Sequence, residues 1–169
     1  MPEDKRTSPE FIDERIRPYY AMIENLDHNV GQVNAFLEAE GLADDTIVIF
    51  TSDHGELSGA HGLLAKQQPY EESIGIPFLV YSRNERLVPR GQRFADPVCT
   101  EDICPTIRGL AGLQADAKLP GVDLSPLIRG ERDRLDREVV LLELVAELRP
   151  QAPYHTETWR GIRTRTHKY

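Results

Sequence analysis

The chain has 169 residues, of which 40% are hydrophobic and 28% are charged, and its formal net charge is −8. This length supports one hydrophobic core of ordinary size, and the composition is that of a globular protein. The acidic charge argues against nonspecific binding to nucleic acid, which requires a basic face. Two cysteines, Cys99 and Cys104, are too few for a disulfide framework, and their spacing fits no common zinc motif.

Targeting and membrane signals are missing from the sequence. No apolar stretch follows the first six residues, so we expect no signal peptide within these 169 residues. No window reaches the roughly 18 apolar residues that a transmembrane helix needs, so no membrane partner is expected. The sequence therefore leaves the localisation undetermined.

The first predicted element is a helix near the N-terminus. Ser8 followed by Pro9 is typical of a helix start, and Pro18 is expected to interrupt or restart the helix. Apolar residues then recur every three or four positions from Tyr20 to Leu37. This spacing predicts an amphipathic helix that ends near Gly41.

Two short apolar runs predict buried strands in the next part of the chain. All six residues from Thr46 to Thr51 are β-branched or aromatic, and residues 77–81 are similarly apolar. A long polar segment that reaches about Ser73 and contains Gly55, Gly59 and Gly62 follows the first run.

The second half of the chain continues the alternation of helices and strands. We expect a helix at 100–110, a helical turn at 125–130, a strand rather than a helix at 138–145, and an alternating strand at 159–169. The order of elements indicates an α/β protein. It offers few strands for a doubly wound sheet, which predicts part of a larger fold.

Asp53 and His54 are the strongest candidate site residues. They follow the first strand directly, at the carboxyl end where open α/β sheets place their ligands. A carboxylate and an imidazole there can share a metal ion, and Gly55 permits a sharp turn beside them. The alternative is an ordinary turn in which Asp53 caps the next segment and His54 faces solvent. His61 and Lys66 lie on the following loop, where each alone would be a solvated side chain.

Seven segments together match one family pattern in order and spacing. They are residues 20–31, 51–56, 59–66, 69–77, 100–112, 120–130 and 160–169. These segments resemble the C-terminal half of the sulfatase family, within the alkaline-phosphatase superfamily. The resemblance implies a partial alkaline-phosphatase/sulfatase-like α/β fold. Residues 1–18 would be a lead-in, 19–135 the C-terminal part of the catalytic central-sheet domain, and 136–169 the start of a small C-terminal subdomain.

The resemblance also implies roles for the four candidates. Asp53 and His54 would be ligands of a divalent cation, usually Ca²⁺ and sometimes Mg²⁺ or Mn²⁺. Lys66 would contact the sulfate oxygens, and His61 is carried over as a second catalytic candidate. The implied reaction is hydrolysis of a small sulfated, or alternatively phosphorylated, substrate, with formylglycine as nucleophile.

The chain departs from the family pattern at that nucleophile. Formylglycine arises within Cys-x-Pro-x-Arg or Ser-x-Pro-x-Arg, and neither occurs in the 169 residues. Cys104 precedes its proline directly and aligns with a structural helix, so we interpret it as a packing residue. The N-terminal Asp pair that completes the family's metal site is also missing. We therefore expect little or no sulfatase activity from this chain alone, with formylglycine only in a missing N-terminal part.

Two other interpretations stay open. One keeps the fold and changes the substrate to a phosphonate monoester or phosphodiester, which His54 and the thirteen-residue step from Asp53 to Lys66 slightly favour. The other is a non-catalytic metal-binding or interaction fragment, in which exposed sheet edges lead to self-association or to a partner.

Overall fold

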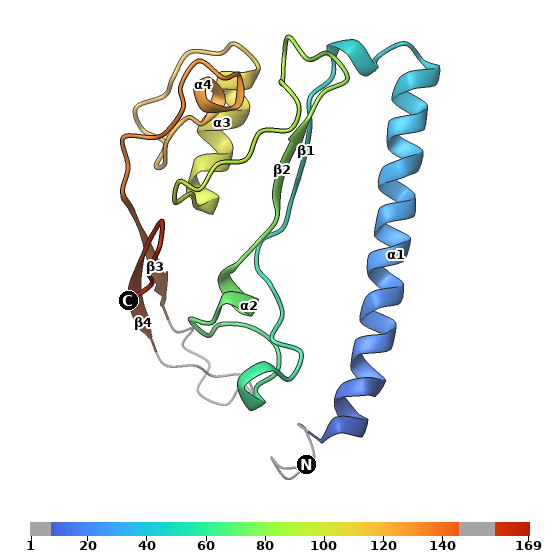
Figure 1. The fold of residues 1–169 in the computed structure, drawn as a ribbon, viewed down its shortest axis with the longest axis vertical. Helices are drawn as coiled ribbons and strands as arrows, with labels where there is room; N and C mark the ends of the chain where they lie inside the picture. The colour runs from blue at the N-terminus through green and yellow to red at the C-terminus, as the bar shows by residue number, and fades with distance from the viewer. Residues whose placement is uncertain (1–7, 146–157) are drawn as a thin grey trace. The chain divides into compact units, whose positions relative to one another are not determined.

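The computed structural model describes residues 8–145 and 158–169, and its helices and strands confirm the mixed α/β character (Figure 1). The α-helices are α1 (Pro9–Ala39), α2 (Glu71–Ile74), α3 (Ile103–Leu110) and α4 (Ser125–Ile128). Short 3₁₀ turns occur at η2 (Ala43–Asp45), η3 (Ala60–Gly62) and η4 (Thr100–Asp102). The strands are β1 (Val48–Thr51), β2 (Phe78–Tyr81), β3 (Val139–Leu144) and β4 (Trp159–Thr164). Strand β1 pairs with β2, and β3 pairs with β4.

Helix α1 is continuous over 31 residues. Ser8 caps its N-terminus as predicted, because the Phe11 amide donates a hydrogen bond to Ser8 Oγ at 3.3 Å. Pro18 lies inside the helix, so the predicted interruption there is wrong. Both Pro18 and Glu14 are exposed, so the Glu14 carbonyl that loses its usual amide partner can be hydrated by solvent.

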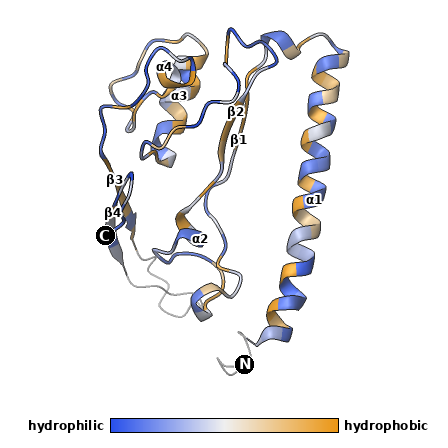
Figure 2. Ribbon diagram, viewed as in Figure 1, coloured by the Kyte–Doolittle hydropathy of each residue, from blue (hydrophilic) through white to orange (hydrophobic). Residues whose placement is uncertain are grey.

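Hydrophobic residues recur along α1 (Figure 2). None of the residues of this helix is buried. Six of these side chains have exposed fractions between 47% and 65%: Tyr20, Met22, Ile23, Leu26, Val33 and Phe36. No helix in the described part of the chain is long and apolar enough to cross a membrane. Helix α1 therefore presents an apolar face that the described residues leave accessible.

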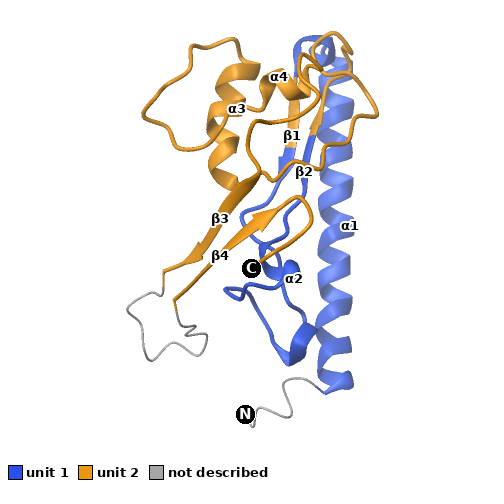
Figure 3. Cartoon of the chain, turned by 60° about the vertical axis from the view of Figure 1, so that its left-hand side comes forward, with its two compact units in different colours: residues 1–46, 50–79, 148–156 blue, residues 47–49, 80–147, 157–169 orange. Residues whose placement is uncertain are grey.

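The chain divides into two compact units (Figure 3). Among the described residues, the first unit comprises 8–46 and 50–79, and the second comprises 47–49, 80–145 and 158–169. The division inferred from the family resemblance, with boundaries after residues 18 and 135, concerns a whole sulfatase fold and stays a prediction.

The second unit holds most of the buried apolar side chains: Val88, Leu124, Leu127, Ile128, Leu135 and Val140. The helix predicted from Thr100 to Leu110 forms as η4 followed by α3. The strand predicted at 138–145 is confirmed as β3, which pairs antiparallel with β4. The strand predicted to reach Tyr169 is wrong in its extent. It ends at Thr164, and the chain folds back so that Tyr169 exchanges two backbone hydrogen bonds with Ile162, at 2.9 and 3.0 Å.

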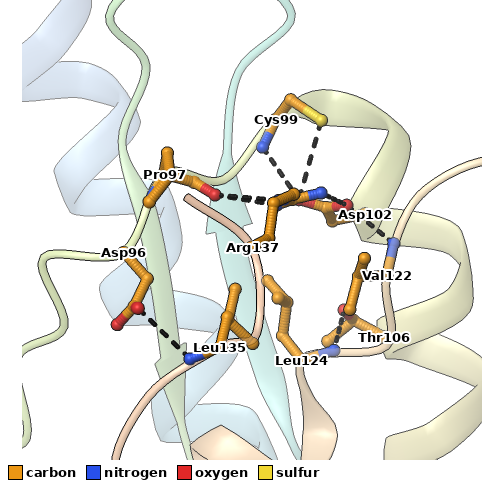
Figure 4. Close-up of polar contacts among 9 residues, drawn as sticks. All are labelled: Asp96, Pro97, Cys99, Asp102, Thr106, Val122, Leu124, Leu135 and Arg137. Carbon is orange, nitrogen blue, oxygen red and sulfur yellow. Dashed lines mark hydrogen bonds and ion pairs between the residues drawn. The ribbon is translucent and has the colours of Figure 1, made fainter. Parts of the chain in front are cut away.

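Asp102 is fully buried in the second unit and joins three segments of it (Figure 4). Its carboxylate accepts hydrogen bonds from the Cys99 amide at 2.9 Å, the Val122 amide at 2.8 Å and both terminal nitrogens of Arg137. Arg137 also donates to the Pro97 carbonyl, at 2.8 Å. Burial raises the pKa of Asp102, but the hydrogen bonds from Arg137 and the two amides together lower it below 3.8. The stabilisation by the ionised carboxylate is therefore present at neutral pH and is lost only as the pH falls below that value.

Replacing Arg137 tests the importance of this cluster. Arg137→Ala leaves a buried carboxylate without its counter-ion, so we expect the free energy of unfolding to fall by about 3–5 kcal/mol. Arg160→Ala is the matched control, because Arg160 pairs with Glu143 at 3.0 Å on the surface, with the Arg160 side chain 71% exposed. The control should cost about 0–1 kcal/mol. Urea unfolding followed by circular dichroism measures both, and equal losses would contradict the assignment.

Candidate metal and anion site

The predicted turn after β1 is present and contains Asp53. The His54 amide donates a hydrogen bond to Asp53 Oδ1 at 2.9 Å. This hydrogen bond is the main reason why the pKa of Asp53 lies below its ordinary value, and the charges of His54 and Lys66 lower it further. The Asp53 side chain is 84% exposed. Asp53 is therefore an ionised carboxylate with oxygen atoms accessible to a ligand.

The ring of His54 is oriented by the backbone beside it. Its Nδ1 lies 2.8 Å from the Gly55 carbonyl oxygen. A carbonyl only accepts, so Nδ1 carries a hydrogen, and Nε2 is the ring nitrogen that can either hold a proton or offer a lone pair to a metal ion. That Nε2 lies 3.4 Å from Asp53 Oδ2. Two electron-rich atoms at this separation favour a cation between them, either a proton or a metal ion.

Gly55 fixes this turn against α2. Its amide donates to the Ser73 carbonyl at 2.8 Å, and Ser73 is only 3% exposed. A Cβ atom on Gly55 would lie 2.0 Å from the Glu72 carbonyl oxygen. Only glycine allows the backbone to approach this closely.

The loop that follows has an unusual backbone. Four of its non-glycine residues have positive φ angles between 48° and 78°: Ser58, His61, Ala65 and Gln67. Such angles are uncommon for non-glycine residues, and they cluster at ligand sites where the surrounding structure enforces them. Lys66 is exposed and lies between two of the four.

His61 contacts the segment that begins α2. Its ring stacks on Tyr70 with a centroid separation of 3.8 Å and an interplanar angle of 13°. Its Nε2 lies 3.4 Å from Glu72 Oε2. The structure gives His61 these partners rather than Asp53 or His54.

The four candidates are therefore only partly brought together. Asp53 and His54 are in contact, and the charge of Lys66 reaches Asp53 and lowers its pKa. His61 is held by Tyr70 and Glu72, whose roles the sequence did not reveal. The family resemblance covered both residues, but it attached no function to them.

A metal ion fits this site only in part. Asp53 supplies hard oxygen atoms and His54 one nitrogen, whereas Ca²⁺ takes six to eight oxygen ligands. Among residues 8–145 and 158–169 there is no group of three or more His, Cys, Asp or Glu side chains that could hold a metal. Asp53 and His54 could thus supply only part of the coordination shell of a metal ion.

Comparison with known proteins shows which family the chain resembles in sequence and in structure. The family model named Sulfatase matches residues 2–113. The chain is 34% identical to an ulvan-active sulfatase of Formosa agariphila, over 92% of this chain and 30% of that protein. It is 38% identical to arylsulfatase K of Danio rerio, over 73% of this chain and 24% of that protein. A solved structure of a putative sulfatase from Bacteroides fragilis matches with a TM-score of 0.76 at 32% identity, over 95% of this chain and 33% of that chain.

Fold and site together define an α/β protein with a carboxylate and an imidazole in contact at the end of β1 and an exposed lysine on the following loop. The chain belongs to the sulfatase family, as the resemblance indicated, and spans about a third or less of the relatives it matches. Its fold is accordingly a partial alkaline-phosphatase/sulfatase-like fold. Members of this family generally use a divalent cation and formylglycine.

Gly55→Ala tests the contact between the turn and α2. The added methyl group collides with backbone, so we expect a loss of about 1–3 kcal/mol in the free energy of unfolding. Gly31→Ala is the matched control, because nothing lies within 4 Å of its Cβ position in α1. It should stabilise the helix by about 1 kcal/mol. Thermal unfolding of both variants measures the difference, and a neutral Gly55→Ala would contradict the close approach.

Proposed function

We propose that this chain supplies part of the active site of a sulfatase-type hydrolase. Asp53 and His54 are ligands of its divalent cation, and Lys66 contacts the sulfate group of the substrate. The observation that carries the proposal is the 3.4 Å approach of His54 Nε2 to Asp53 Oδ2, in a ring whose Nδ1 is bound to the Gly55 carbonyl. His61 is the fourth candidate of this site.

The substrate class follows from what the relatives share. Their names include ulvan-active sulfatase, arylsulfatase K, steryl-sulfatase and choline-sulfatase, at 34–38% identity. These names have the sulfate group in common, whereas the remainder of the substrate varies. We therefore propose a small sulfate ester as the substrate and assign no particular alcohol.

A divalent cation at Asp53 and His54 would polarise the sulfate oxygens and stabilise the charge that develops on them. Lys66 adds a positive charge on the neighbouring loop, and its effect on the pKa of Asp53 supports its proximity. Ca²⁺ is the ion expected from the family. Because the imidazole nitrogen is a less usual ligand for Ca²⁺ than oxygen is, Mn²⁺ is the informative ion for comparison.

Substitution of the two ligands tests the proposed cation site. Asp53→Asn removes the charge and His54→Ala removes the nitrogen, so each should weaken Mn²⁺ and Ca²⁺ binding by about tenfold or more. Titration calorimetry on the 169-residue chain measures the dissociation constants.

The matched controls are Asp45→Asn and His28→Ala, at exposed positions outside the site. Each should change the dissociation constants by less than about twofold, because salt screens the interaction of a bound cation with exposed side chains outside the site. If the controls weaken binding as much as the site variants do, the cation binds the acidic surface in general and the proposed site is wrong.

The isolated chain should not turn over a substrate. The segment that forms formylglycine does not occur in the 169 residues, and the described residues provide two of the cation ligands. We expect no divalent-cation-dependent hydrolysis of an aryl sulfate by the purified chain. Turnover that disappears in Lys66→Met would refute this and would require a different nucleophile.

A second candidate keeps the site and changes the substrate to a phosphonate monoester. The chain is 27% identical to a phosphonate monoester hydrolase from Silicibacter pomeroyi, with a TM-score of 0.61 over 72% of this chain and 24% of that chain. His54 at the second ligand position is compatible with this alternative.

Two anions of equal charge discriminate between the candidates. Phenyl sulfate and the phenyl monoester of methylphosphonate are both monoanions at neutral pH. In the presence of Mn²⁺, we expect phenyl sulfate to shift the Lys66 side-chain resonances at the lower concentration, because Lys66 contacts sulfate oxygens. The shift should vanish in Lys66→Met. Tighter binding of the phosphonate monoester would favour the second candidate.

A non-catalytic role remains the third candidate. The apolar residues exposed on α1 and the two-stranded sheet of β1 and β2 offer surfaces for a partner or for self-association. Sedimentation of the chain over a range of concentrations tests this candidate, and a stable monomer counts against self-association.

A further inference from the structure

We propose that Tyr70, His61 and Glu72 form a clamp that positions Lys66 for its anion. The inference rests on the proposed function, in which Lys66 contacts sulfate, and it assigns roles to residues outside the cation pair. His61 then acts as a positioning residue for the loop. We call these three residues the Tyr70 clamp.

The loop that carries Lys66 needs an external hold. Positive φ angles at Ala65 (65°) and Gln67 (78°) flank the lysine, and neither residue is glycine. Such a backbone relaxes to ordinary angles unless packing and hydrogen bonds enforce it. The contacts that keep the loop in place therefore determine where the Lys66 ammonium group lies.

The base of the loop is held by Leu57. Its side chain is 2% exposed, and its amide donates to the Ala65 carbonyl at 2.7 Å, directly before Lys66. Within the loop, the Gly59 amide donates to the Leu63 carbonyl at 2.8 Å. These bonds close the loop upon itself, but they do not fix it to another element.

The clamp attaches the loop to the segment that begins α2, in addition to the Ile12 side chain of α1, which lies against Gly59. His61 lies in the middle of η3 with a φ of 56°, and its ring is stacked on Tyr70 at 3.8 Å. The approach of its Nε2 to Glu72 Oε2 at 3.4 Å adds a polar contact on the same segment. Stacked rings and a charged partner together restrict the two side-chain torsions of His61, and so restrict the loop backbone.

The segment that holds the loop also holds the cation turn. Ser73 accepts the Gly55 amide at 2.8 Å, one residue after Glu72. Residues 70–73 thus attach to the turn of Asp53 and His54 on one side and to the Lys66 loop on the other. This double attachment sets the position of the lysine relative to the cation ligands within the first unit.

The test compares variants that remove the clamp with variants that keep it. Tyr70→Leu removes the ring and His61→Gln removes the stack, whereas Tyr70→Phe keeps a ring in place. His28→Gln is the control for a histidine outside the clamp, since the His28 ring is exposed on α1 and makes a polar contact with Gln32 at 2.8 Å. The first readout is the initial rate of trypsin cleavage after Lys66, followed by mass spectrometry of the new terminus at Gln67. The second is the pair of dissociation constants for phenyl sulfate and for Mn²⁺.

We expect Tyr70→Leu and His61→Gln to raise cleavage after Lys66 by about threefold to tenfold, the range expected for one aromatic contact. Phenyl sulfate should bind at least about threefold more weakly, while the Mn²⁺ constant stays within about twofold, because Gly55 and Ser73 are unchanged. Tyr70→Phe and His28→Gln should both leave the cleavage rate and the dissociation constants at their wild-type values.

The proposed role of the clamp is wrong if Tyr70→Leu leaves cleavage after Lys66 at the wild-type rate. It is also wrong if Tyr70→Phe raises the cleavage rate as much as Tyr70→Leu does. If Tyr70→Leu also accelerates cleavage after Arg132, which belongs to the second unit, the chain has unfolded, and Glu72→Gln then decides by the same criterion. The cleavage readout needs neither ion nor substrate. A chain that binds no Mn²⁺ but shows the clamp effect would refute the proposed function and leave the clamp intact.

Discussion

The hydrogen bond from the Gly55 amide to the Ser73 carbonyl is the contact on which the candidate site depends. It joins the end of β1, where Asp53 and His54 lie, to the helical turn α2. The approach is so close that the Glu72 carbonyl occupies the place of a side chain at residue 55. Because α2 also contacts His61, the cation ligands and the lysine loop share one support. An irregular segment between two strands thereby acquires a defined geometry with little hydrophobic core of its own.

In the second unit, a buried carboxylate holds the irregular segments in place. Asp102 is 0% exposed, and its two oxygens receive hydrogen bonds from the chain near residues 99, 122 and 137. Removal of a carboxylate from water is costly, and the Arg137 guanidinium and the two amides offset that cost. This arrangement fixes connecting segments that are mostly loop. In both units, polar contacts to the backbone determine where irregular chain lies, and helices and strands supply the anchoring points.

Local patterns predicted most of the secondary structure and directed attention to the turn after β1 as the candidate site. The run of β-branched residues indicated β1, and the serine before Pro9 indicated the start of α1. Pro18 was misjudged because an exposed helix tolerates a lost hydrogen bond that a buried helix would not. Asp53 and His54 were identified by their place after a strand, and the comparisons confirmed the family. The stacking of His61 on Tyr70 and the pairing of Asp102 with Arg137, 35 residues apart, depend on loop conformations that no periodicity encodes.

We propose above all that Asp53 and His54 bind one divalent cation, with the Nδ1 of the histidine ring already held by the Gly55 carbonyl. Paramagnetic broadening by sub-stoichiometric Mn²⁺ in nitrogen-detected NMR of the labelled chain tests it most directly. We expect the His54 ring and the amides of residues 53–55 to broaden first, and Nδ1 to remain protonated when diamagnetic Ca²⁺ replaces Mn²⁺. Broadening that begins at His28 or at the acidic turn η2, with His54 unaffected, would contradict it.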